Sequence, residues 1–169
     1  MTARRAVVRG FVQGVGFRFF AQRSARSLGV RPEHKVLEIG SGSGYQTAVL
    51  GKLARSVYSL ERIDELARTA AALLASLGYH NVSVKAFDGT YGYPAAAPYD
   101  RILVTAGTES VPEPLLAQLA VGGRLVVPIG PPGKQRLRVI RRRKTDYAQE
   151  EGEDVTFVPL LGRFAGSPA

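Results

Sequence analysis

The stretch KVLEIGSGSGYQTAVL, Lys35 to Leu50, carries a short apolar run into a cluster of three glycines. KVLEI predicts a buried strand, and the segment from Tyr45 to Leu53 predicts the helix that follows the glycines. Glycines in such a turn let the backbone pass close beneath a ligand without a side-chain clash. A dinucleotide fingerprint would be G-x-G-x-x-G, and here the third glycine, Gly44, comes one residue early. The spacing therefore argues against a nicotinamide dinucleotide.

From Lys35 onward, the predicted strands and helices alternate. After the first strand and helix, the expected elements are the strand SVYSLE, the helix Ile63 to Leu77, the strands NVSVKAF and YDRILVTAG, the helix PEPLLAQLA and the strand GGRLVVPIG. The chain is expected to close with an antiparallel pair, RLRVIRRR and DVTFVPLLG, around the polar turn TDYAQEEGE. Such alternation predicts an α/β fold with a doubly wound, Rossmann-like sheet that is mostly parallel and has helices on both faces.

The residues before this sheet predict an extra strand and helix. Arg5 to Val12 predicts the strand, and apolar residues recur at helical spacing from Phe19 to Leu28, where Gly29 is placed to end the helix. A length of 169 residues favours one domain. We expect residues 1–31 to form a strand, loop and helix that is not an independent domain, and residues 32–169 to form the main domain.

Polar side chains stand at the ends of three predicted strands. Glu61 ends the strand after the glycine loop, Asp88 follows the next strand, and Thr105 follows the one after that. Ligands of such sheets bind at the carboxyl ends of the strands. A carboxylate at Glu61 can accept two hydrogen bonds from a ribose diol, and Asp88 can accept one from an adenine amine. The alternative is a tight turn beside ordinary surface acids.

Several segments together resemble the protein-L-isoaspartate O-methyltransferases from about Arg31 to Gly162. They are VLEIGSGSGYQTAVL, VYSLERIDELA, LGYHNVSVKAFDGTYGYP, APYDRILVTAG, VPEPLLAQLAVGGRLVVPIG and FVPLLG. The resemblance implies that the chain binds S-adenosylmethionine and methylates the carboxylate of isoaspartyl residues in proteins, which are its expected partners. It implies that the glycine loop lines the methionine portion, Glu61 the ribose, and Asp88 with Gly89 the adenine. The implied cofactor site comprises Glu38, Gly40, Ser41, Gly42, Gly44, Glu61, Arg62, Asp88, Gly89 and Thr105.

A second resemblance lies upstream. The segment from Val8 to Val30, with VRGFVQGVGFR, is similar to the opening of the acylphosphatases, which implies an anion cradle with Arg18 as its clamp. The family's catalytic asparagine has no counterpart, because the only asparagine is Asn81. This loop stands where the methyltransferases carry a Ser or Thr that contacts the substrate. Either methylation is impaired, or Arg18 and the loop amides have taken over carboxylate binding.

Three function classes therefore remain: a repair methyltransferase, an acylphosphatase-like hydrolase, and a cofactor-binding remnant without catalysis. For the first, no catalytic side chain is predicted, because a carboxylate nucleophile with a pKa near ~4 is already ionised and needs no general base.

Composition and charge restrict the classes of ligand and partner that we expect. The chain has no cysteine, and His34 and His80 are isolated and expected in surface turns, so no metal site is expected. The net charge is +9, but the basic run from Lys134 to Lys144 has no interleaved aromatics and fits a solvated edge hairpin, so nucleic acid is an unlikely partner. No apolar run approaches the ~20 residues of a membrane span, and no signal region is evident, so we expect a cytoplasmic protein.

Overall fold

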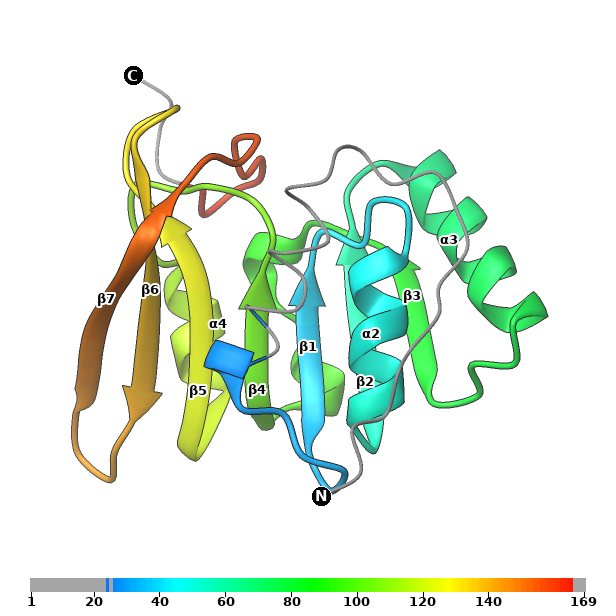
Figure 1. Ribbon diagram of the computed structural model, residues 1–169, viewed down its shortest axis with the longest axis horizontal. Helices are drawn as coiled ribbons and strands as arrows, with labels where there is room; N and C mark the ends of the chain where they lie inside the picture. The colour runs from blue at the N-terminus through cyan, green and yellow to red at the C-terminus, as the bar shows by residue number, and fades with distance from the viewer. Residues whose placement is uncertain (1–23, 25, 166–169) are drawn as a thin grey trace.

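The computed structural model describes residue 24 and residues 26–165 and contains one seven-stranded sheet (Figure 1). The strands are β1 (Lys35–Ile39), β2 (Ser56–Glu61), β3 (Val82–Ala86), β4 (Tyr99–Val104), β5 (Leu119–Ile129), β6 (Gln135–Arg142) and β7 (Tyr147–Val155). Their order is β3-β2-β1-β4-β5-β6-β7. The first five strands run parallel, whereas β6 and β7 are antiparallel to their neighbours. The predicted mostly parallel, doubly wound sheet is confirmed.

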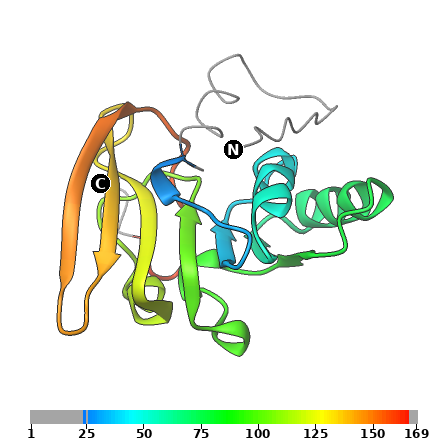
Figure 2. The same cartoon turned by 60° about the horizontal axis from the view of Figure 1, so that its bottom comes forward.

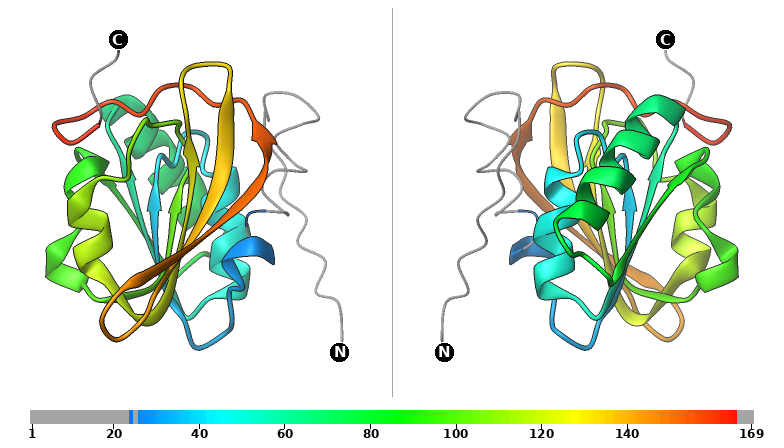
Figure 3. Two further views of the ribbon diagram at one scale, coloured as in Figure 1. Left: turned by 90° about the vertical axis from the view of Figure 1, so that its left-hand side faces the viewer. Right: turned by 90° about the vertical axis from the view of Figure 1, so that its right-hand side faces the viewer.

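Helices cover both faces of this sheet. They are α2 (Tyr45–Leu53), α3 (Asp64–Ser76) and α4 (Glu113–Gln118), with short 3-10 turns η1 (Gly89–Tyr91) and η2 (Pro94–Ala96). Figures 2 and 3 show α2 and the helical residues before β1 on one face, and α4 on the other. Leu74 of α3 packs with Ala48 of α2.

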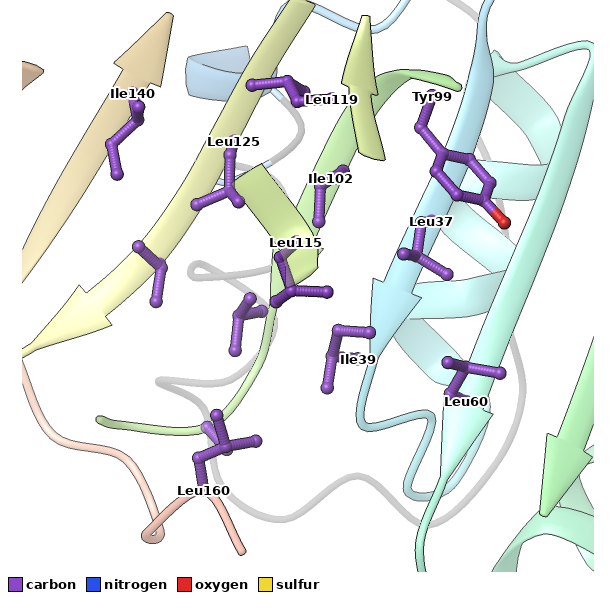
Figure 4. Packing of buried hydrophobic residues seen from close by; sticks show 13 residues of the cluster. Leu37, Ile39, Leu60, Tyr99, Ile102, Leu115, Leu119, Leu125, Ile140 and Leu160 are labelled. Carbon is purple, nitrogen blue, oxygen red and sulfur yellow. The ribbon is translucent and has the colours of Figure 1, made fainter. Parts of the chain in front are cut away.

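The central strands are apolar on both faces because both faces are covered. Leu37 and Ile39 of β1 face a large cluster that includes Leu115 of α4 and Leu160 near the C-terminus (Figure 4). Val36, on the opposite face of the same strand, packs with a second cluster that includes Leu50 of α2 and Leu28. β1 therefore lies at the centre of the core, and the loop that follows it begins from a rigid position.

The prediction of the last strand was wrong. β7 is formed by Tyr147–Val155, most of which was expected to be a turn. The described residues from Thr156 onward belong to no strand of the sheet. The prediction placed the strand on the apolar segment that contains Leu160, but Leu160 enters the core from a segment that is not part of the sheet. The strand itself, β7, lies at the edge of the sheet and is mostly exposed. An edge strand needs no apolar face to be buried.

The basic run in β6 pairs with acids of β7. Arg136 binds Glu151 and Asp154 at 3.0 and 2.8 Å, and Arg138 binds Glu151 at 2.7 Å. Arg141 approaches Glu150 at 3.3 Å. The expected solvated hairpin is confirmed, and these arginines have carboxylate partners within it.

Part of the expected N-terminal helix is described. Ser24 and residues 26–28 are helical, and Gly29 follows with φ +60°, as predicted for a helix end. The backbone carbonyls at this end accept hydrogen bonds from Arg101 (to Gly29, 3.2 Å) and Arg124 (to Ser27, 3.4 Å). The extra strand from Arg5 to Val12, the first glycine loop and Arg18 lie outside the described residues.

The two histidines differ in environment. His80 is exposed in a turn, as expected. His34 was expected at the surface as well, but the residue is only 8% exposed and its Nδ1 accepts the Arg31 N–H at 2.9 Å. Burial, with Arg101 nearby, lowers the pKa of His34. It is therefore a neutral structural group that closes the turn before β1. In the part of the chain that the structure describes, no helix is long and apolar enough to cross a membrane.

Candidate functional site

The glycine loop lies where the sheet changes direction. β1 is flanked by β2 on one side and β4 on the other, so successive crossovers leave it toward opposite edges of the sheet. Open α/β sheets bind ligands in the crevice at such a switch point, outside the carboxyl ends of the strands. The loop leaves β1 at Ile39, and α2 begins at Tyr45 with Gly44 at its N-cap. The loop thus connects the switch point to a helix N-terminus.

Three glycines of this loop adopt left-handed backbone conformations. The φ angles are +95° at Gly40, +49° at Gly42 and +79° at Gly44. A Cβ at Gly40 would overlap the hydroxyl of Thr105, and one at Gly44 would lie 3.3 Å from Ala70. At Gly42 a Cβ would meet nothing within 4 Å among the described residues. The loop therefore packs tightly at both ends and is open at its centre.

This difference predicts unequal effects of two alanine substitutions. Gly42→Ala should cost about 1–2 kcal/mol of stability, because only the left-handed conformation is strained. Gly40→Ala should cost about 1–3 kcal/mol more, because its Cβ also collides with Thr105. Urea unfolding of both variants measures the difference. Equal losses would show that the Gly40–Thr105 contact is not tight.

Thr105 secures the start of the loop. Its Oγ1 lies 2.8 Å from the carbonyl oxygen of Ile39 and 2.7 Å from that of Gly40. The Gly40 N–H donates to the carbonyl of Leu60 in β2 at 2.7 Å. Neighbouring strands on both sides thus hold the first loop residue in place.

Glu61, the last residue of β2, holds the centre of the loop. One oxygen, Oε2, accepts the Gly42 N–H at 2.9 Å, and the other, Oε1, accepts the Ile63 N–H at 3.0 Å. The residue is only 8% exposed. Each carboxylate oxygen can accept more than one hydrogen bond, so both retain capacity toward a diol. The predicted proximity of Glu61 to the glycine loop is confirmed.

Glu38 lies buried beneath the loop. Its Oε2 accepts hydroxyl hydrogen bonds from Thr47 at 2.5 Å and Ser59 at 2.6 Å, and Oε1 has no partner among the described residues. Complete burial raises the pKa of Glu38 to about 7, and the charge of Glu61 acts in the same direction, against the two hydroxyl donors. With a pKa of about 7, this carboxyl is present in both its charged and its neutral form at neutral pH.

Asp88 and Gly89 follow β3 on the same edge. Oδ1 of Asp88 accepts from the Thr90 N–H and hydroxyl, and Oδ2 accepts the Arg163 N–H at 2.8 Å. Partial burial acts to raise the pKa of Asp88, but these donors and nearby Arg62 lower it below its usual value. A Cβ at Gly89 would overlap Ile39 of β1, so only glycine fits there.

Two further polar side chains have buried atoms without partners. The Ser41 hydroxyl, and both amide atoms of Gln46 at the start of α2, find no hydrogen-bond partner among the described residues. Buried polar groups are normally paired, so orphaned ones beside an open loop point to a missing partner such as a ligand. From the sequence, the position of Gln46 directly after the loop fits either a wall of the cofactor pocket or simple packing, and it was not among the predicted cofactor residues.

The structure thus brings the predicted cofactor residues to one edge of the sheet, with Arg62 exposed beside Asp88. Thr47 and Ser59, which bind Glu38, were missed because hydroxyls in a helix and a strand carry no pattern of their own. Across residue 24 and residues 26–165, no cluster of three metal-ligating side chains is found.

Comparison with known proteins gives two family matches. The model of the protein-L-isoaspartate(D-aspartate) O-methyltransferases matches residues 19–165, and that of the acylphosphatases matches residues 4–31. The two matches share residues 19–31, so the boundary expected at residue 31 stays a prediction.

Individual relatives agree with the longer match. Protein-L-isoaspartate O-methyltransferase 2 of Pelobacter propionicus is 53% identical over 138 residues, which cover 80% of this chain and 61% of the relative. The corresponding enzyme of Rhodopseudomonas palustris is 55% identical over 129 residues, covering 75% and 59%. The chain therefore spans about 60% of the length of these relatives.

Solved structures show the same architecture. A protein-L-isoaspartate O-methyltransferase superposes with a TM-score of 0.80 at 29% identity, covering 86% of this chain and 48% of the other. A Plasmodium falciparum protein described as a putative member of the family, in complex with S-adenosyl-L-homocysteine, gives a TM-score of 0.72 at 23% identity, covering 93% and 79%. The glycine loop, the acid that ends β2, the acid that follows β3, and the match over residues 19–165 lead to one conclusion: the chain belongs to the protein-L-isoaspartate(D-aspartate) O-methyltransferase family.

Proposed function

We propose that this protein binds S-adenosylmethionine at the glycine loop and transfers its methyl group to the carboxylate of isoaspartyl residues in proteins. The observation that carries the proposal is the contact between Glu61 and Gly42, which ties an acidic strand end to the open centre of a glycine loop at the switch point. Isoaspartyl proteins as partners and a cytoplasmic location belong to the same proposal.

The residues present fit such a cofactor. In the proposal, Glu61 accepts hydrogen bonds from the ribose hydroxyls, while Gly40, Ser41, Gly42 and Gly44 line the methionine portion. Within the described part of the chain, the Ser41 hydroxyl has no partner and a Cβ at Gly42 would meet no atom within 4 Å, which supports this placement. Asp88 and Gly89 receive the adenine. Glu38, Arg62 and Thr105 complete the site by supporting the loop and its flanking turns.

The proposed reaction requires no general acid or base. The cofactor supplies an electrophilic methyl group, and the substrate carboxylate, with a pKa near ~4, is ionised without a base. What the chain must do is align the two and exclude water, and such positioning can supply roughly 7–11 kcal/mol of the barrier. The substrate carboxylate requires donors, and Arg18 with the amides of the first glycine loop is the candidate clamp.

The test combines titration and turnover. Calorimetric titration with S-adenosylhomocysteine should show binding, and methyl transfer from S-adenosylmethionine should occur to an isoaspartyl peptide but not to the same peptide with ordinary aspartate. Arg18→Ala should raise KM for the peptide at least about fivefold. The control variant, Arg26→Ala, removes an exposed arginine and should leave KM unchanged.

Each rival makes a different prediction in the same assays. Cofactor binding without methyl transfer would identify a binding remnant. No cofactor binding, together with hydrolysis of an acyl phosphate that inorganic phosphate inhibits, would favour the acylphosphatase-like reading.

A further inference from the structure

The segment after β7 is fastened to the sheet at three successive points. Gln135 is 2% exposed and pairs with the Phe157 backbone, accepting its N–H at 2.6 Å and donating to its carbonyl at 3.2 Å. Gly107, beyond β4, exchanges hydrogen bonds with Val158 and Leu160 at 2.8 and 2.7 Å. Figure 1 shows this part of the chain passing along the carboxyl-end edge of the sheet.

The third fastening point is Asp88 with Thr90. Thr90 is fully buried, and its hydroxyl donates to Asp88 Oδ1 at 2.7 Å while accepting the Phe164 N–H at 3.1 Å. Arg163 adds its own N–H to Asp88 Oδ2 at 2.8 Å. One hydroxyl therefore links the carboxylate to the C-terminal segment.

Packing reinforces the same junction. The rings of Tyr91 and Phe164 meet edge to face with centroids 4.9 Å apart, a geometry that favours aromatic pairs. A Cβ at Gly162 would overlap Asp88 and lie 2.6 Å from Thr90. The backbone of the C-terminal segment thus lies directly against the carboxylate, with no room for a side chain between them.

The hydrogen bonds fix which oxygen is available to a ligand. A carboxylate oxygen accepts about two hydrogen bonds. Oδ1 of Asp88 already receives two, both from Thr90, at 3.0 and 2.7 Å. Among the described residues, Oδ2 receives one, from the Arg163 N–H. The remaining acceptor position is on Oδ2, beside the C-terminal segment.

We propose that Thr90 is a positioning residue that ties the segment Gly162–Ala165 to Asp88, so that binding of an adenine amine at Asp88 and docking of this segment stabilise each other. The inference rests on the proposed cofactor site. Coupling of this kind is reciprocal: if docking strengthens ligand binding by some factor, the ligand strengthens docking by the same factor.

The experiment uses two variants of one side chain. Thr90→Val keeps the shape of the buried residue but removes the hydroxyl, whereas Thr90→Ser keeps the hydroxyl. Calorimetry with S-adenosylhomocysteine should show about tenfold weaker binding for the valine variant and binding within about twofold of wild type for the serine variant. Leu161→Ala changes an exposed residue directly before this segment and should bind as wild type does.

Amide hydrogen exchange tests the coupling directly. If Thr90 had only a structural role, ligand binding would not change the exchange rates of the amides in the C-terminal segment. Saturating S-adenosylhomocysteine should slow exchange of the Arg163 and Phe164 amides severalfold in the wild-type protein, and the valine variant should lose most of this protection. If the valine variant does not fold, Gly162→Ala, whose Cβ displaces the same segment, should give the same result.

The possible results distinguish failure of the Thr90 coupling from failure of the proposed cofactor site. Ligand binding that is equal in all folded variants, with no change in exchange at the two amides, would overturn the coupling but not the cofactor site. Wild-type protein that binds no S-adenosylhomocysteine would overturn both.

Discussion

The Glu61→Ala variant should bind S-adenosylhomocysteine at least about 100-fold more weakly than the wild-type protein. Hydrogen bonds to a charged group are worth about 1.5–3 kcal/mol each, and the proposed ribose contacts involve two. The substitution also leaves the Gly42 and Ile63 amides without their acceptor, so the centre of the loop loses its anchor. Calorimetric titration of the folded variant measures the loss.

The control is Glu65→Ala, which removes an exposed carboxylate from the first turn of α3. It should leave the affinity for S-adenosylhomocysteine unchanged. Glu61→Gln keeps one acceptor oxygen, so its affinity should lie between those of Glu61→Ala and Glu65→Ala. Unaltered affinity in Glu61→Ala would remove the ribose assignment, even though the family membership would stand.

The second large effect concerns stability and pH at Glu38. The pKa of its buried carboxyl is about 7 in the folded protein against an ordinary value of 4.5. Because the folded state holds this proton more tightly, the contribution of Glu38 to stability is full below about pH 4.5 and declines as the pH rises through 7. The loss amounts to about 3 kcal/mol. Glu38→Gln cannot ionise, so its stability should lack this decline.

Urea unfolding from pH 4.5 to 8 compares the two proteins. The difference in unfolding free energy between Glu38→Gln and wild type should shift by about 3 kcal/mol in favour of the variant across this range. Glu33→Gln, at a mostly exposed acid, should follow the wild-type curve. Parallel curves for wild type and Glu38→Gln would show that Glu38 titrates normally.

Much of the first half of the fold could be predicted because pattern and packing agree there. KVLEI forms β1, SVYSLE forms β2, and α2 spans Tyr45–Leu53 as expected. In this region apolar runs are buried, and glycines stand where the backbone requires them. The edge of the sheet that carries the candidate site could be predicted from topology, since the predicted acids stand at strand ends that a parallel sheet places together.

The rest depended on contacts far apart in the sequence. β7 was not predicted because its residues are mostly polar and exposed, so the sequence shows no alternation of apolar and polar residues there. The orphaned polar atoms of Gln46 and the link from Thr90 to Phe164, 74 residues away, become visible only once the chain has folded. The burial of His34 likewise follows from tertiary packing.

The acidic edge strand has a consequence for the behaviour of the protein at high concentration. Among the described residues β7 ends the sheet, and it carries Glu150, Glu151, Glu153 and Asp154. Backbone groups on an unpaired edge are a template for joining another strand. Charged side chains on an edge strand disfavour such joining, so the acidic residues of β7 count against a second copy adding a strand here, although three of them bind arginines of β6.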